Sequence, residues 1–204
     1  LVGISAFLIG MVLFLSPAAA QPPPLLPPAP SADEEPVAVT TAWSVDAVHP
    51  TGNAVLAVVL DIRKSYHIMA DKGQLSEIQD FKPFPTRVWV SEATEGVLSE
   101  PPVYPRATPF KVDFVNAPIM SFEGRTVIYL PIRLNLNAPG GDVFVKVGVE
   151  YQACAPTYCL MPQRAVHTAE LPLAPRDAKT TSINREPFSA YESRATAGPQ
   201  RLIP

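Results

Sequence analysis

Proline is the residue that most restricts the fold of this chain, because 25 of its 204 residues are Pro. A Pro inside a helix costs about 3 kcal/mol, since it removes a backbone donor and its ring clashes with the preceding turn. This composition therefore argues against a helical bundle and favours short strands joined by turns.

Charge and metal-ligand counts exclude further classes of protein. The 16 Lys and Arg residues against 19 Asp and Glu residues give a net charge of −3. No basic excess is available to neutralise phosphates, so we expect no nucleic-acid partner. The chain has only two Cys and three His residues, which excludes an all-cysteine zinc site, and we predict no metal site. It also lacks a Gly-rich phosphate loop and the GxSxG and HExxH motifs of familiar enzymes.

The composition changes along the chain and divides it into four segments. Residues 1–20 are apolar and end in SPAAA, a pattern typical of a secretory signal peptide, with a membrane anchor as the alternative. Residues 21–36, QPPPLLPPAPSADEEP, form a Pro-rich linker. Residues 37–174 are long enough for one domain with its own core. Residues 175–204 lack a periodic apolar pattern and predict a polar tail or second linker. We expect the domain to be periplasmic or otherwise exported, and membrane-attached if the signal is uncleaved.

The domain has the pattern of short antiparallel strands. Apolar residues alternate or cluster in six runs, separated by Gly- and Pro-containing turns; the runs are residues 37–45, 54–62, 88–90, 127–134, 143–151 and 169–173. Many short strands with such turns predict an all-β sandwich.

Both cysteines of the chain lie in one short segment, residues 148–163, GVEYQACAPTYCLMPQ. Cys154 and Cys159 could form a structural disulfide, the default for an exported domain. A bridge that closes so short a loop removes only about 2 kcal/mol of unfolded-state entropy, against about 4.7 kcal/mol for a 100-residue loop. They could instead form a redox couple, in which one thiolate makes a mixed disulfide and its neighbour resolves it. The spacing alone leaves the two alternatives about even.

The segment YQACAPTYCLMPQ resembles the active-site segment of the amino-terminal periplasmic domain of the DsbD family of thiol:disulfide interchange proteins. Residues 64–69, KSYHIM, and residues 85–105 are similar to further stretches of that family in the same order. The resemblance covers most of residues 40–173, and the cysteine segment is its specific part.

This resemblance implies an immunoglobulin-like antiparallel β-sandwich with extended linkers at both ends. It implies electron transfer from a thioredoxin-like or membrane donor to oxidised periplasmic thiol–disulfide proteins, such as disulfide isomerases or cytochrome c maturation factors. Cys159 would form the intermolecular disulfide and Cys154 would resolve it, with no cofactor beyond the cysteines. We expect a monomer, because long apolar edges are not obvious.

The resemblance also suggests which residues surround the cysteines. Further site residues are a mobile aromatic cap with Phe114 next to Asp113, the Tyr66, His67 and Met69 stretch, Gln152 in a hydrogen bond with the cysteine loop, and Pro162 as a restraint on chain direction.

The chain departs from the family in three respects. The loop between the cysteines is one residue shorter than in the best-known members, and His67 and Met69 stand where those members carry tyrosines. The sequence also ends at Pro204 without a membrane module. We expect either a fragment, with a membrane module beyond the chain end, or a stand-alone relative.

Two functions from other classes remain open. Cys154, Cys159, Met161, Met69 and His67 are soft or borderline ligands that suit Cu(I), which predicts an exported copper-binding module. The second is a non-catalytic binding sandwich with a structural disulfide.

Overall fold

The computed structural model describes residues 35–135 and 140–196. The predicted signal peptide, most of the predicted Pro-rich linker and residues 197–204 lie outside the described residues. Within the described part, the structure has no helix long and apolar enough to cross a bilayer.

The regular elements of the described residues are eleven strands and one helix. In chain order the elements are β1 (Val37–Trp43), β2 (Asn53–Ile62), β3 (His67–Met69), β4 (Arg87–Ala93), β5 (Val97–Ser99), β6 (Thr108–Phe110), β7 (Ile119–Phe122), β8 (Arg125–Leu134), β9 (Val143–Tyr151), β10 (Ala153–Cys154), β11 (Gln163–Leu171) and α1 (Arg185–Thr196).

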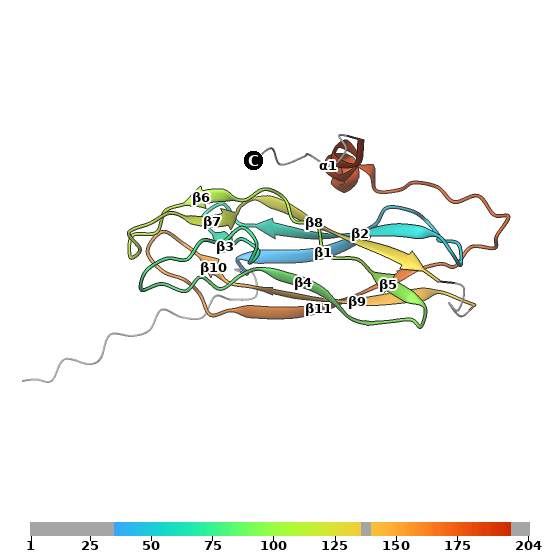
Figure 1. The fold of residues 1–204 in the computed structure, drawn as a ribbon, viewed down its shortest axis with the longest axis horizontal. Coiled ribbons are helices and arrows are strands. Elements are labelled where there is room, and N and C mark those ends of the chain that lie inside the picture. The colour runs from blue at the N-terminus through green and yellow to red at the C-terminus, as the bar shows by residue number, and fades with distance from the viewer. Residues whose placement is uncertain (1–34, 136–139, 197–204) are drawn as a thin grey trace, which may run out of the picture.

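The strands form two long layers and a smaller sheet at one end. One layer has the order β1-β2-β8-β5 and the other the order β11-β9-β4, and the main apolar core lies between them. The third sheet has the order β10-β3-β7-β6, and its strands gather at the left-hand end of the molecule in Figure 1. All strand pairings within these sheets are antiparallel. The predicted antiparallel β-sandwich is therefore confirmed.

Strand β9 shows why alternation in the sequence was informative. Its residues Val143, Val145, Val147 and Val149 are buried in the core, whereas Lys146 between them is only partly buried. Successive side chains of a strand point to opposite faces, so this alternation turns one face inward.

The paired strand β11 extends further toward its N-terminus than predicted. The sequence marks only the end of this last strand, at residues 169–173, whereas the pairing with β9 runs from Gln163 to Leu171. Most side chains of residues 163–168 are exposed, so an apolar pattern could not reveal them. Backbone hydrogen bonds, not burial, define this half of the strand.

The structure differs from the expectation that residues 175–204 form a polar tail or linker. Ser182 forms a β-bridge with Val45, and α1 packs on the outer face of β2 and β8. Phe188 of α1 is buried there with Tyr129, whose hydroxyl donates to the carbonyl of Pro187 at 2.7 Å. Few apolar side chains achieve this docking, which explains why no periodic pattern marks it.

We expect Phe188→Ala to release α1 without unfolding the sandwich. Truncating a buried Phe costs about 3–5 kcal/mol, and here the loss is limited to the docking free energy of the segment. Amide hydrogen exchange should accelerate at least about tenfold in α1 and stay unchanged in β9. Ser189→Ala, at the exposed next position, is the matched control. An equal acceleration in β9 would show that the segment is an inseparable part of the core.

The docked segment should also weaken in acid. The backbone N–H of Thr181 donates to Asp46 Oδ1 at 2.7 Å, and this hydrogen bond lowers the pKa of Asp46. A lowered folded-state pKa contributes stability that is present above the unfolded pKa and is lost as pH falls through the folded one. The Thr181 amide resonance should therefore titrate with Asp46 in acid. In Asp46→Asn this titration should disappear; if it persists, another group controls it.

Candidate functional site

The cysteine segment is the tip of a long hairpin that changes sheets. Strands β9 and β11 pair from Val143 opposite Leu171 to Tyr151 opposite Gln163. Beyond Tyr151 the chain continues as β10, which pairs with β3 of the small sheet instead of with β4. The hairpin tip is thereby held against strand β3, far away in the sequence.

Two backbone hydrogen bonds set the position of the cysteines in this tip. The N–H of Leu160 donates to the carbonyl of Ala153, and the N–H of Ala155 donates to the carbonyl of Tyr158, both at 2.8 Å. Cys154 and Cys159 lie directly opposite each other between these bonds. They are thus a non-hydrogen-bonded pair, the type in which opposite residues come closest. The two cysteines form a disulfide with a Cα–Cα distance of 4.0 Å.

The disulfide lies on the face of the small sheet that is turned away from the main core. Ala153 and its cross-strand neighbours Ile68 and Phe122 belong to the main core. Cys154 and Met69 point to the opposite face, where they belong to a second, smaller apolar cluster. The small sheet therefore separates the sandwich core from the disulfide.

Two connections cover this second cluster. Residues 70–86, between β3 and β4, contribute Leu75, Ile78 and Phe81, and residues 111–118, between β6 and β7, contribute Val112 and Val115. The disulfide is therefore packed among apolar side chains of two connections and is not a bridge on the protein surface.

The predicted cap segment lies against the cysteine hairpin through its backbone. The N–H of Asp113 donates to the carbonyl of Pro156 at 2.8 Å. Phe114 is 49% exposed and meets Phe81 edge-to-face with 6.0 Å between ring centroids. Phe114 is thus the outer residue of the cover, and the buried Val112 and Val115 are its inner residues. Neither valine was predicted from the sequence, because short apolar side chains in a loop carry no periodic signal.

The two cysteines differ in burial. Cys154 is fully buried at 0% exposure, whereas Cys159 is only partly buried. This difference follows from the topology, because β10 lies between β3 and the returning strand that carries Cys159. Cys159 is the more exposed of the two residues.

His67 lies directly opposite Cys154 in the pairing of β3 with β10. Its Nε2 is 3.0 Å from Glu123 Oε2, and its ring stacks on Phe110 with 3.6 Å between centroids. Its Nδ1 is buried and makes no hydrogen bond within the described residues. His67 is therefore a polar neighbour of the disulfide whose ring is held by an aromatic stack and a carboxylate.

Tyr66 contacts the hairpin on the face opposite the disulfide. Its hydroxyl is 3.1 Å from that of Tyr158, and the two rings meet edge-to-face. Tyr158 precedes Cys159, so its side chain points to the face opposite the disulfide. Tyr158 was not predicted as a site residue from the sequence, where its position next to Cys159 is the only signal.

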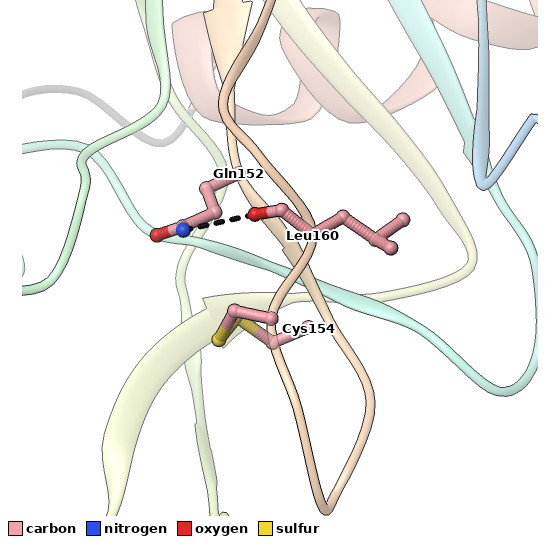
Figure 2. The surroundings of a disulfide bond; sticks show 4 residues. Gln152, Cys154 and Leu160 are labelled. Carbon is pink, nitrogen blue, oxygen red and sulfur yellow. Dashed lines mark hydrogen bonds between the residues drawn. A yellow bond between two sulfur atoms is a disulfide. The ribbon is translucent and has the colours of Figure 1, made fainter. Parts of the chain in front are cut away.

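Gln152 closes the hairpin where the chain changes sheets. Its Nε2 donates to the carbonyl of Leu160 at 3.0 Å, next to the disulfide in Figure 2. The exposed Pro162 follows two residues later, immediately before β11. The hydroxyl of buried Tyr151 donates to the Val37 carbonyl at 3.5 Å. Burial raises the pKa of Tyr151, which keeps the phenol protonated at neutral pH.

Of the side chains considered for Cu(I), Met161 lies apart from Met69 and the cysteines. Met69 is fully buried beside the disulfide, whereas Met161 is 77% exposed. Among the described residues, no group of three or more His, Cys, Asp and Glu side chains is arranged to hold a metal ion.

Comparisons with known proteins give distant structural similarities. No protein-family model and no curated protein matches the chain. The N-terminal periplasmic domain of ScsB from Proteus mirabilis is similar over 83% of this chain, with a TM-score of 0.46 and 10% identity, and the chain spans 56% of its length. The N-terminal domain of Neisseria meningitidis DsbD in the reduced form is similar over 74% of this chain and 94% of its own length, with a TM-score of 0.35 and 15% identity. Similarities this distant decide nothing about chemistry, which the residues of this chain must carry.

We expect Gln152→Ala to make the disulfide easier to reduce. The lost hydrogen bond is worth about 1 kcal/mol and holds the two hairpin strands together, so the thiols of the variant meet less often. The reduction potential should rise by about 20 mV, since 30 mV corresponds to about 1.4 kcal/mol. Gln163→Ala is the matched control, because the Gln163 amide donates to the Met161 carbonyl outside the cysteine pair. Equal potentials in the two variants would contradict a clamping role for Gln152.

Proposed function

We propose that this chain is an exported thiol–disulfide exchange domain that acts through Cys154 and Cys159. The observation that carries the proposal is their asymmetric placement in one hairpin, with Cys154 buried in an apolar cluster and Cys159 partly exposed. A purely structural bridge needs no such asymmetry, and this one closes too short a loop to stabilise the fold by more than about 2 kcal/mol.

The exchange proceeds in two balanced steps. The Cys159 thiolate attacks one sulfur of a partner disulfide, forming a mixed disulfide and releasing the other partner sulfur as a thiolate that takes up a proton. The Cys154 thiolate then attacks Cys159 Sγ, which re-forms the intramolecular disulfide and releases the second partner thiolate. The two electrons gained by the partner come from the dithiol, and no cofactor beyond the cysteines is needed. Recharging by a donor dithiol runs the same steps in reverse.

The cover over the disulfide limits reaction with small oxidants. Phe114 and Asp113 lie at its outer edge, and their displacement together with the 111–118 connection gives a partner access to Cys159. His67, with Glu123, supplies a polar group beside a pair that is otherwise enclosed by apolar side chains such as Met69.

The partners are a thioredoxin-like or membrane-embedded electron donor and oxidised periplasmic thiol–disulfide proteins, which include disulfide isomerases and cytochrome c maturation factors. The apolar segment 1–20 has the pattern of a secretory signal peptide, which supports this assignment because disulfides persist in oxidising compartments. The domain acts as a monomer.

The reduction potential of the pair tests whether the disulfide is exchangeable. Exchangeable couples lie between about −120 and −270 mV, and structural disulfides below about −300 mV. Alkylation in graded thiol buffers should give a value in the upper range. A value well below about −300 mV would leave the binding sandwich with a structural disulfide as the function.

We expect Cys154→Ala to accumulate mixed disulfides through Cys159. Without the resolving thiol, the second step cannot occur. The reduced variant is mixed with oxidised thioredoxin as a probe, and the adduct is located by non-reducing electrophoresis and peptide mass spectrometry. Cys159→Ala is the control and should trap much less probe, because Cys154 is buried. If adducts form only through Cys154, the assigned roles are wrong.

A further inference from the structure

The strand that carries Cys159 has a free backbone edge. Cys154 and Cys159 form a non-hydrogen-bonded pair, so the peptide N–H and C=O groups of each point away from the other strand. The peptide groups of Cys154 face β3, where His67 is paired with Cys154. Those of Cys159 face outward and make no hydrogen bond with any residue that the structure describes.

This edge is short and bounded at both ends. The turn at Pro156 and Thr157 closes it on one side, and Pro162, which has no N–H, ends it on the other. Tyr158 and Met161 flank Cys159 and are 48% and 77% exposed. A short edge interrupted by Pro resists uncontrolled strand pairing, yet here it belongs to the partly exposed Cys159.

We propose that the Cys159 edge receives an extended segment of the redox partner as an added strand. The segment is the stretch of partner chain that carries the attacked disulfide, and its backbone pairs with the N–H and C=O groups of Cys159. Main-chain hydrogen bonds provide affinity that does not depend on partner sequence. Tyr158 and Met161 provide apolar contacts on either side of Cys159.

The mixed disulfide determines the occupant. A partner sulfur bonded to Cys159 Sγ brings the partner backbone within the roughly 4.4–6.8 Å that separates Cα atoms across a disulfide. The Cα atoms of a hydrogen-bonded antiparallel pair lie about 5.5 Å apart, so covalent exchange and strand pairing are compatible in distance. One accessible cysteine can in this way serve several partners that share only an extended, cysteine-bearing segment.

The inference rests on the proposed function, because the partner segment is the one that Cys159 attacks. The chemistry is the first exchange step: the Cys159–partner S–S bond forms, the partner S–S bond breaks, and the leaving sulfur departs as a thiolate. Strand pairing adds no chemical step and only positions the sulfurs.

The test uses a peptide probe of seven residues with a central Cys among Thr and Val, activated as its thionitrobenzoate disulfide. Two modified versions of this peptide, called twins, carry backbone N-methyl groups on alternate residues. One twin is methylated at the odd positions and the other at the even positions. Alternate N–H groups of a strand face opposite edges, so methylation in only one twin blocks pairing with Cys159. The rate of thionitrobenzoate release is measured with reduced full-chain Cys154→Ala, with a small activated disulfide as reference.

We expect the unmodified peptide and one twin to react about tenfold faster than the other twin, from the loss of one or two hydrogen bonds. Exchange of the Cys159 amide should slow about tenfold in the peptide adduct but not in the small-thiol adduct. The Leu160 amide, already bonded to Ala153, is the internal reference.

Three results overturn the inference. Equal rates for all peptides, with the mixed disulfide still forming, would exclude strand pairing and leave the proposed function intact. No adduct at Cys159 with any probe, the small disulfide included, would contradict the proposed function itself. Protection of the Cys159 amide in the free protein, rising with its concentration, would make a second copy of this chain the occupant.

Discussion

The pairing of β10 with β3 is the interaction on which the whole site depends. It takes the tip of the β9–β11 hairpin out of the three-stranded layer and adds it to the small end sheet. This pairing brings Cys154 opposite His67 and places the disulfide under the two connections that flank β3 and β7. Without it the cysteines would lie at the end of an ordinary two-stranded ribbon, with nothing to bury one of them.

The change of sheet also gives the small sheet two different tasks. One face completes the sandwich core through Ile68, and the other carries the disulfide through Cys154. The period of two along a strand assigns adjacent residues to these tasks, so a shift of one residue would bury the wrong set. Gln152 and the Tyr66–Tyr158 pair fix the hairpin from both ends, which holds this register at the tip.

Much of the fold could be predicted from the sequence, because a strand with one buried face has apolar residues at alternate positions. Strand β9 is the clearest example, and the β-sandwich follows from several such runs. The elements that the sequence does not mark lack such a pattern: α1 buries few apolar side chains, chiefly Phe188, and the first half of β11 is held by backbone bonds. The cysteines could be found by composition and resemblance, but the cover could not. Val112 and Val115 are ordinary loop residues until the 111–118 connection is folded over Cys154.

The short spacing of the cysteines, a departure from the resembling family, has a simple geometric reason in this chain. Four residues separate Cys154 from Cys159, which is the number that a two-residue turn allows between members of the second pair from the hairpin tip. That pair is non-hydrogen-bonded here, since Ala155 and Tyr158 share the hydrogen bond at the tip. The spacing thus sets both the approach of the sulfurs and the outward direction of the Cys159 peptide groups. A fifth residue would have to be accommodated by a bulge or a longer turn at the tip.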